Sequence, residues 1–129
     1  MIAAAEDIAT ILEAETEMVL GTDLFIGKEL SKPDNCVTIF DISGEPADIA
    51  LDGSSYQKPS IQLRIRNNNQ LVASTLCQTL LGILDGLGNV VVGTTTYMII
   101  YCSSGPALLD WDANERIRFI INFNIKRKE

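Results

Sequence analysis

The stretch RIRFIINFNIKRK at 116–128 limits most strongly what this chain can fold into. Apolar residues stand at positions 117, 119, 121, 123 and 125, and polar residues fill most of the positions between them. Because successive side chains of a strand point to opposite faces, one face of this stretch is apolar and has to be covered. The pattern therefore predicts a half-buried strand in a sheet with a packed layer on one side.

A second stretch, SIQLRIR at 60–66, alternates in the same way. Its apolar positions are Ile61, Leu63 and Ile65, and Arg64 and Arg66 fall on the opposite face. The two alternating stretches place arginines on the polar face of two strands. If these strands are neighbours in the sheet, their basic side chains form one patch.

Three further strands are predicted at 24–30, 36–42 and 94–102, and the last of these has a start that can lie as early as residue 89. The stretch 43–59 contains two glycines, two prolines and three acids, so it predicts a long loop. Gly105 and Pro106 predict a turn in the link before the final strand.

Two helices are predicted, the first over residues 3 to about 20 and the second from 70 to 87. Gly21 is a stop signal for the first helix, and the asparagines at 67–69 are N-cap candidates for the second, which Gly86 and Gly88 end. The apolar positions expected on the two helix faces are Ile8, Ile11, Leu12, Met18 and Val19 in the first, and Val72, Leu76, Leu80, Ile83, Leu84 and Leu87 in the second.

This order of elements predicts an α+β fold in one domain, 1–129. We expect a two-layer sandwich, with an antiparallel or mixed sheet covered on one face by two helices. The length of 129 residues fits a single domain with its own core.

Charge is unevenly placed along the chain, whose net charge is −7. Residues 1–52 hold twelve acids and two bases, whereas residues 53–129 hold five acids and eight bases. Such asymmetry can give a protein two faces of opposite sign that meet head to tail in an assembly.

We therefore interpret Arg64, Arg66, Arg116 and Arg118 as interface residues that face acidic protein neighbours. Two alternatives are a solvated sheet face and a sequence-independent grip on nucleic acid. Nucleic acid is disfavoured because the sequence pI is about 4.5 and both Phe119 and Phe123 fall on the apolar face, where they cannot stack on bases.

Enzymatic chemistry finds little support in the residues. The chain has no histidine, so it lacks the commonest general base and metal ligand, and its three cysteines are far apart in the sequence. No stretch predicts a metal, a cofactor, a membrane helix or a secretory signal. An enzyme with carboxylate chemistry, using Asp110, Asp112 and Glu115, remains an alternative.

Four segments, taken together, resemble a known family. They are PDNCVTIFD at 33–41, Y-x-x-P-S-x-Q-x-R-x-R at 56–66, Gly105-Pro106, and D-x-N-x-R-x-x-F-x-x-N-F-x-I-x-R at 112–127. Their order and spacing over residues 33–129 resemble the minor capsid or tail terminator proteins of tailed bacteriophages that infect Gram-positive bacteria.

The resemblance implies a small α+β structural protein without catalytic residues or cofactors. Such proteins form a ring, commonly a hexamer, that caps the finished tail tube and presents a docking surface to the head connector. It implies a virion protein at the head–tail junction, assembled in the cytoplasm of the host bacterium. Another connector component, such as a stopper or a minor capsid protein, is the nearest alternative. An acidic ring would let DNA pass through its lumen without specific binding.

Overall fold

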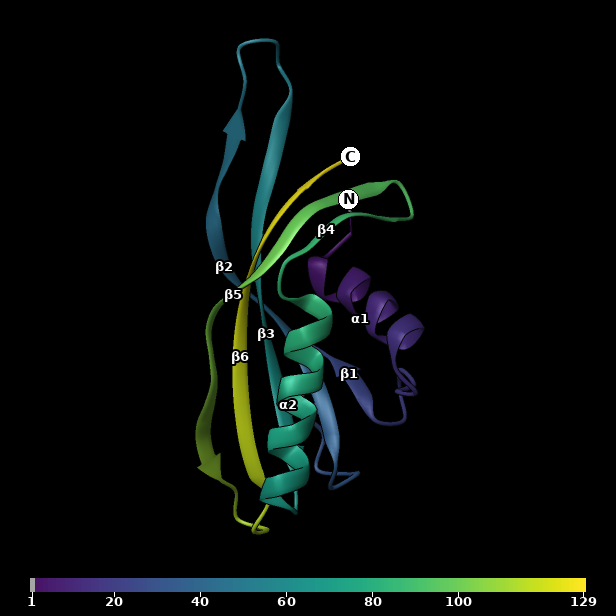
Figure 1. The fold of residues 1–129 in the computed structure, drawn as a ribbon, viewed down its shortest axis with the longest axis vertical. Helices are drawn as coiled ribbons and strands as arrows, with labels where there is room; N and C mark the ends of the chain where they lie inside the picture. The colour runs from purple at the N-terminus through teal and green to yellow at the C-terminus, as the bar shows by residue number, and fades with distance from the viewer. Residues whose placement is uncertain (1) are drawn as a thin grey trace.

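The computed structural model describes residues 2–129, in which two helices pack against a six-stranded sheet (Figure 1). The elements in chain order are α1 (Ala4–Glu15), β1 (Leu24–Ile26), β2 (Cys36–Ile49), β3 (Ser55–Asn67), α2 (Gln70–Leu84), β4 (Leu87–Val92), β5 (Thr95–Trp111) and β6 (Ile117–Lys128). The α+β class predicted from the sequence is confirmed.

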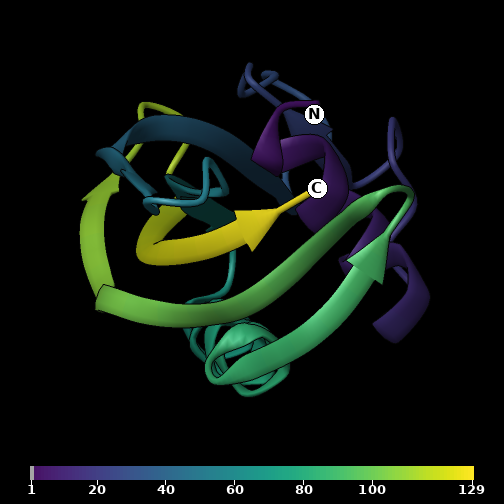
Figure 2. The same cartoon turned by 90° about the horizontal axis from the view of Figure 1, so that it is seen from above.

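The sheet is mixed, with the strand order β1-β2-β3-β6-β5-β4. Only the β1–β2 pair is parallel, and the other four pairs are antiparallel. Figure 2 shows that the strands follow a curled path instead of lying in one plane. A flat two-layer sandwich therefore describes the molecule only in part.

Both helices pack against one face of the sheet, and a single apolar core lies between the helices and that face. The two alternating stretches behave as predicted, because Ile61, Leu63 and Ile65 of β3 are fully buried and face Ile121 and Phe123 of the adjacent β6. Each such side chain contributes roughly 1.5–3 kcal/mol on burial, so this apolar face is a main source of the stability of the fold.

The first helix is shorter than predicted and ends at Glu15 instead of near residue 20. Thr16 ends it, because its backbone is extended and its hydroxyl donates to the Leu12 carbonyl (2.6 Å) while accepting from the Met18 amide (3.1 Å). The assignment of Val19 to the buried face is wrong, since this side chain is 51% exposed.

The second helix begins as predicted at the Asn69 N-cap, whose side-chain oxygen accepts from the amides of Leu71 (3.0 Å) and Val72 (3.2 Å). It ends at Leu84, earlier than residue 87. Gly86, with φ of +82°, turns the chain directly into β4, so Leu87 and Gly88 belong to a strand.

The prediction of a long loop at 43–59 is wrong. β2 and β3 continue through this stretch as a hairpin, called the arm below, which projects beyond the rest of the molecule (Figure 1). The turn lies at 50–54, where the Gly53 amide donates to the Ala50 carbonyl (3.0 Å) and Gly53 has φ of +87°. Asp-Gly between alternating residues is a hairpin signal, and it is present at 52–53.

The prediction of a turn at Gly105-Pro106 is also wrong, because β5 continues through these residues to Trp111. Beyond Ile100, β5 pairs only with β6, so it forms a sheet edge there. Proline lacks an amide hydrogen and is tolerated at an edge or a bulge, and the register shifts between Ser104 and Ala107 provide the bulge.

A buried polar cluster joins the start of the chain to its end. The Tyr97 hydroxyl is fully buried and donates to the Asp7 carboxylate of α1, and the Arg127 guanidinium of β6 donates to the same hydroxyl (3.1 Å). Arg127 also donates to the Ile2 carbonyl (3.0 Å). Because each buried polar group has a partner, the cluster fixes α1 against β5 and β6.

Candidate functional site

The structure brings the four predicted arginines together on the polar face of the sheet. Arg66 of β3 is the direct register partner of Arg118 in β6, Arg64 lies two residues along β3, and Arg116 immediately precedes β6. Their strand neighbours Ile65 and Ile117 point into the core, so the arginines point away from the helices.

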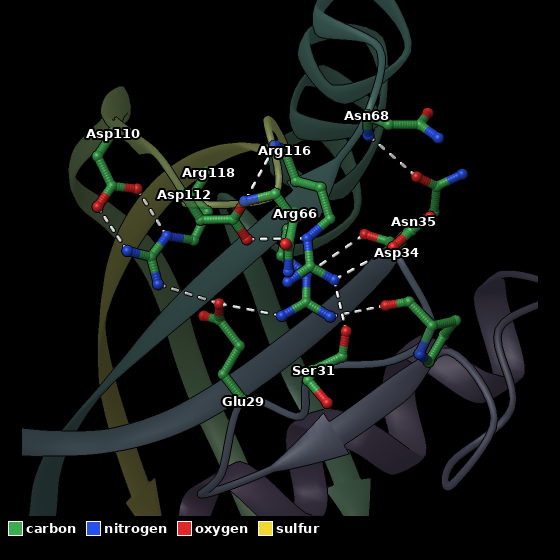
Figure 3. A network of polar contacts seen from close by, with 12 residues as sticks. Glu29, Ser31, Asp34, Asn35, Arg66, Asn68, Asp110, Asp112, Arg116 and Arg118 are labelled. Atoms are coloured by element: carbon green, nitrogen blue, oxygen red, sulfur yellow. Dashed lines mark hydrogen bonds and ion pairs between the residues drawn. The ribbon is translucent and has the colours of Figure 1, made fainter.

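Glu29 lies at the centre of this group (Figure 3). It comes from the segment after β1, where the sequence predicts that the strand continues to residue 30. Its carboxylate accepts from Arg118 (3.1 Å), Arg66 (3.3 Å) and Arg64 (3.5 Å), and its side chain is 12% exposed. One carboxylate thus holds three guanidinium groups from two strands.

Three further carboxylates complete the group, which we call the arginine network. Asp110 accepts two hydrogen bonds from Arg118 (2.6 and 2.5 Å), as in a bidentate pair. Asp112 accepts from Arg116 Nε (2.8 Å), and Asp34 accepts from Arg116 Nη1 (3.2 Å).

Backbone carbonyls on the segment before β2 also belong to the network. Arg66 donates to the carbonyls of Pro33 (2.6 Å) and Asp34 (3.3 Å), and Arg116 donates to the carbonyl of Ser31 (2.5 Å). These hydrogen bonds from the two arginines hold the 31–34 segment in place at the end of the sheet.

All four arginines lie on the polar face as predicted, but two of them are covered by their own chain, since Arg66 is 2% and Arg116 is 5% exposed. The acidic neighbours predicted from the sequence are present, but they belong to the same chain. Glu29 and Asp34 come from the acidic first part of the sequence, so part of the charge asymmetry is neutralised inside the fold. A role of the four arginines at an interface stays a prediction.

The pairing also shifts ionisation. Hydrogen bonds from the Arg118 guanidinium lower the pKa of Asp110, and the same contacts raise the pKa of Arg118. Burial opposes the charged form of Asp112, but the backbone amides of Arg116 and Asn114 and the Arg116 guanidinium lower its pKa overall. Both carboxylates therefore stay charged at a lower pH than a free aspartate does.

An exposed apolar surface lies on α2, and the sequence reasoning missed it. Five residues line a shallow apolar hollow there, and we call them the α2 face: the exposed Leu71, Val72, Thr75 and Thr79, and the partly buried Leu76. Leu71 is 79% and Val72 is 52% exposed, although the sequence predicts Val72 on the buried side. The signal in the sequence is that residues 67–84 contain no charged residue.

Further exposed apolar side chains lie on the second half of β5, where Leu108, Leu109 and Trp111 are 55%, 41% and 50% exposed. Leu108 pairs with Phe119 and Trp111 with Ile117, so both side chains lie on the sheet face that α2 covers. Exposed apolar patches of this kind mark interaction sites in soluble proteins.

A comparison with protein families matches residues 11–129 to the family described as "Bacteriophage tail terminator protein". The chain belongs to this family. The match covers nearly all of the sequence, and the resemblance of residues 33–129 to tail terminator proteins is confirmed. A search of the curated proteins found no match for the terminator.

Membership of the family makes the terminator a structural protein and not an enzyme, a virion component that interacts with other phage tail or head proteins. The alternative enzyme would use the carboxylates of Asp110, Asp112 and Glu115. In the structure Asp110 is paired with Arg118, and Asp112 with Arg116. Glu115 occupies the tight turn before β6 with φ of +60°.

Within residues 2–129 of the terminator, no cluster of three or more possible metal-ligating side chains occurs, and neither helix is both long and apolar enough to span a membrane. A groove of about 590 Å³ runs between α1 and β4, and most of its lining is apolar or small, including Ile11, Ala14, Ile83 and Val91. Its polar side chains are Glu15 and Thr10, whose hydroxyl donates to the Glu6 carbonyl (3.3 Å).

Proposed function

We propose that the terminator assembles as a ring, commonly a hexamer, that caps the tail tube at the head–tail junction and presents the docking surface for the head connector. The exposed apolar surface on α2 and β5 carries this proposal. Leu71, Leu108 and Trp111 are exposed to water in the single chain, and their exposure is explained if another protein surface covers them in the assembly.

The arginine network contributes to this proposal in two ways. Arg66 and Arg116 are buried and position the segment before β2, whereas the side chains of Arg64 and Arg118 are 27% and 23% exposed. We assign Arg64 and Arg118 to direct contact with a neighbouring protein.

The proposal includes passage of DNA through the ring without specific binding. All four arginines are held by two or more acceptors each within the chain, and α1 exposes the acids Glu6, Glu13 and Glu15. A surface of this sign repels phosphates. We expect no tight, salt-sensitive binding of duplex DNA, and tight binding that weakens steeply with salt would contradict this part of the proposal.

The ring is tested by measuring the mass of the purified terminator alone and mixed with tail tubes, by sedimentation and electron microscopy. We expect closed rings at the tube ends. A terminator that stays monomeric at every concentration and does not bind tubes would overturn the proposal. Arg64→Gln tests the arginine assignment, because Arg64 makes a single long ion pair (3.5 Å), one hydrogen bond to Gln62 (3.2 Å) and a contact with the Phe40 ring, all at a part-exposed side chain.

The expected result is weaker ring formation by Arg64→Gln, with a loss of unfolding free energy of at most about 1 kcal/mol, as for a part-exposed ion pair. Lys28→Gln, at an exposed lysine outside the network, is the matched control. Equal assembly of both variants and the wild type would remove Arg64 from the interface.

A further inference from the structure

The arm has an apolar tip that nothing in its own chain covers. Ile49 is 78% exposed and Leu51 is fully exposed, and the arm points away from α2 (Figure 1). A two-stranded hairpin is marginally stable in water unless it packs against something else. The arm therefore has the properties of an element that is completed by contact with another molecule.

We propose that the arm of one copy packs on the α2 face and the second half of β5 of the next copy, an assignment that rests on the proposed ring. Both surfaces belong to the same chain but lie at different places on it. A contact of this kind is heterologous, and it closes into a ring when the rotation between copies permits.

The two surfaces fit each other in length. The seven residues 43–49 of the arm span about 23 Å at roughly 3.3 Å for each residue of a strand. The fifteen residues of α2 span about 22 Å at roughly 1.5 Å for each residue of a helix. An arm lying along α2 would therefore cover the whole helix.

The two surfaces are also compatible in charge. The α2 face offers no charged group, because residues 67–84 contain none. The acids of the arm already have partners in their own chain: Asp48 pairs with Lys58 (3.1 Å), Glu45 lies 3.7 Å from the same ammonium, and Asp52 accepts from the Ser54 amide (2.9 Å). The arm can therefore approach an uncharged surface without leaving a carboxylate newly unpaired.

The area of the contact indicates how strong it is. A fully exposed aliphatic side chain presents roughly 100 Å² and a tryptophan roughly 200 Å². The exposed fractions then give about 330 Å² of apolar side chain on the α2 face and the second half of β5 together. They give about 230 Å² on the arm, with Ile42 at its base. At an apolar share of roughly 60%, the contact buries about 900 Å² in total.

Specific interfaces begin near 1,000 Å² and stable ones bury roughly 1,200–2,000 Å². One arm contact is therefore weak. In a closed ring every subunit gives one arm and receives another, so each subunit is held by two such contacts and no end is left unpaired. We expect free chains to be mainly monomeric at low concentration and to form rings cooperatively on tail tubes.

Cysteine cross-linking tests the contact directly. In a Cys102→Ser background, which leaves only the buried native cysteines, Leu51→Cys and Leu71→Cys chains are mixed in equal amounts on tail tubes and oxidised. We expect a dimer containing one chain of each kind, at least tenfold above that of a control mixture of Leu51→Cys with Val19→Cys. Val19 is 51% exposed and lies outside both surfaces.

A second experiment uses Leu51→Asp, which changes a fully exposed side chain and leaves the fold intact. Val19→Asp is its control. We expect Leu51→Asp to reduce rings at least tenfold and Val19→Asp to leave them unchanged. Wild-type rings together with normal Leu51→Asp rings would overturn the arm contact while the ring stands. Leu51→Asp rings that form but leave the tube would assign the arm to the tube instead. Absence of wild-type rings would remove the ring and the contact together.

Discussion

Replacing Glu29 with glutamine removes the negative charge at the centre of the arginine network and keeps the shape of the side chain. In the native protein this carboxylate accepts from Arg118, Arg66 and Arg64 at 3.1–3.5 Å and is 12% exposed. Glu29→Gln leaves three guanidinium groups close together without their shared counter-charge. We expect the end of the sheet that carries β6 and the 31–34 segment to lose stability.

The size of the loss follows from the other partners of each arginine. Removing one member of a fully buried ion pair costs about 3–5 kcal/mol, whereas an exposed pair contributes at most about 1 kcal/mol. Arg118 keeps Asp110, and Arg66 keeps the carbonyls of Pro33 and Asp34, so the cost lies below the fully buried range. We expect Glu29→Gln to lower the free energy of unfolding by roughly 2–3 kcal/mol, or the Tm by roughly 10 °C.

Urea unfolding at pH 7, followed by circular dichroism, measures this loss. Glu17→Gln is the matched control. Glu17 is exposed and does not belong to the network, and its replacement removes the same charge from the chain. We expect its unfolding free energy to equal that of the wild type. If Glu29→Gln lost less than about 0.5 kcal/mol, the value typical of surface substitutions, the network would contribute no stability and the reasoning would be refuted.

Three further predictions concern other parts of the fold. Tyr97→Phe removes the hydroxyl that serves the buried Asp7 carboxylate and should cost roughly 1–3 kcal/mol in urea unfolding; no loss would contradict the buried cluster. Gly105→Ala should cost roughly 2–4 kcal/mol, because φ is +94° and an added Cβ would lie 2.5 Å from the Ile120 carbonyl oxygen; wild-type stability would refute this geometry. The lowered pKa of Asp112 contributes stability that is complete above about pH 4 and is lost as pH falls through the folded-state value, so Asp112→Asn should show a shallower acid dependence than the wild type, and equal slopes would contradict the assignment.

Strict alternation was the part of the sequence that predicted structure best. It identified β3 and β6 and their buried residues, because a period of two with one apolar face leaves a single register in which those residues are covered. The Asn69 cap was also predictable, since a short polar side chain before an apolar helical run satisfies the first free amides.

The arm and the second half of β5 were not predicted, for a common reason. Glycine and proline at 43–59 and at 105–106 suggested breaks, but Pro46 and Pro106 lie on strand segments at free edges of the sheet, where a proline costs no ladder hydrogen bond. Pro59 lies in the inner strand β3, at the register shift between the Lys58 and Ser60 pairings with β2, where a bulge absorbs the irregularity. Which strand lies at an edge depends on the strand order, and no local pattern contains that order.

For the candidate site, the sequence predicted that Arg64, Arg66, Arg116 and Arg118 would gather and would meet acidic groups. It could not reveal that the acids come from the same chain, because Glu29 is 35 residues or more from every arginine it binds. The apolar surface had a visible sign, the uncharged run at 67–84, which helical periodicity alone assigned to the core.

Electron microscopy of phage particles assembled without the terminator tests the central claim most directly. If the protein caps the tail tube, its removal leaves tube polymerisation unchecked, and we expect overlong tails without attached heads. Restoring the wild-type protein should return the tails to normal length. Tails of normal length that are detached from heads would contradict termination and would restrict the protein to joining.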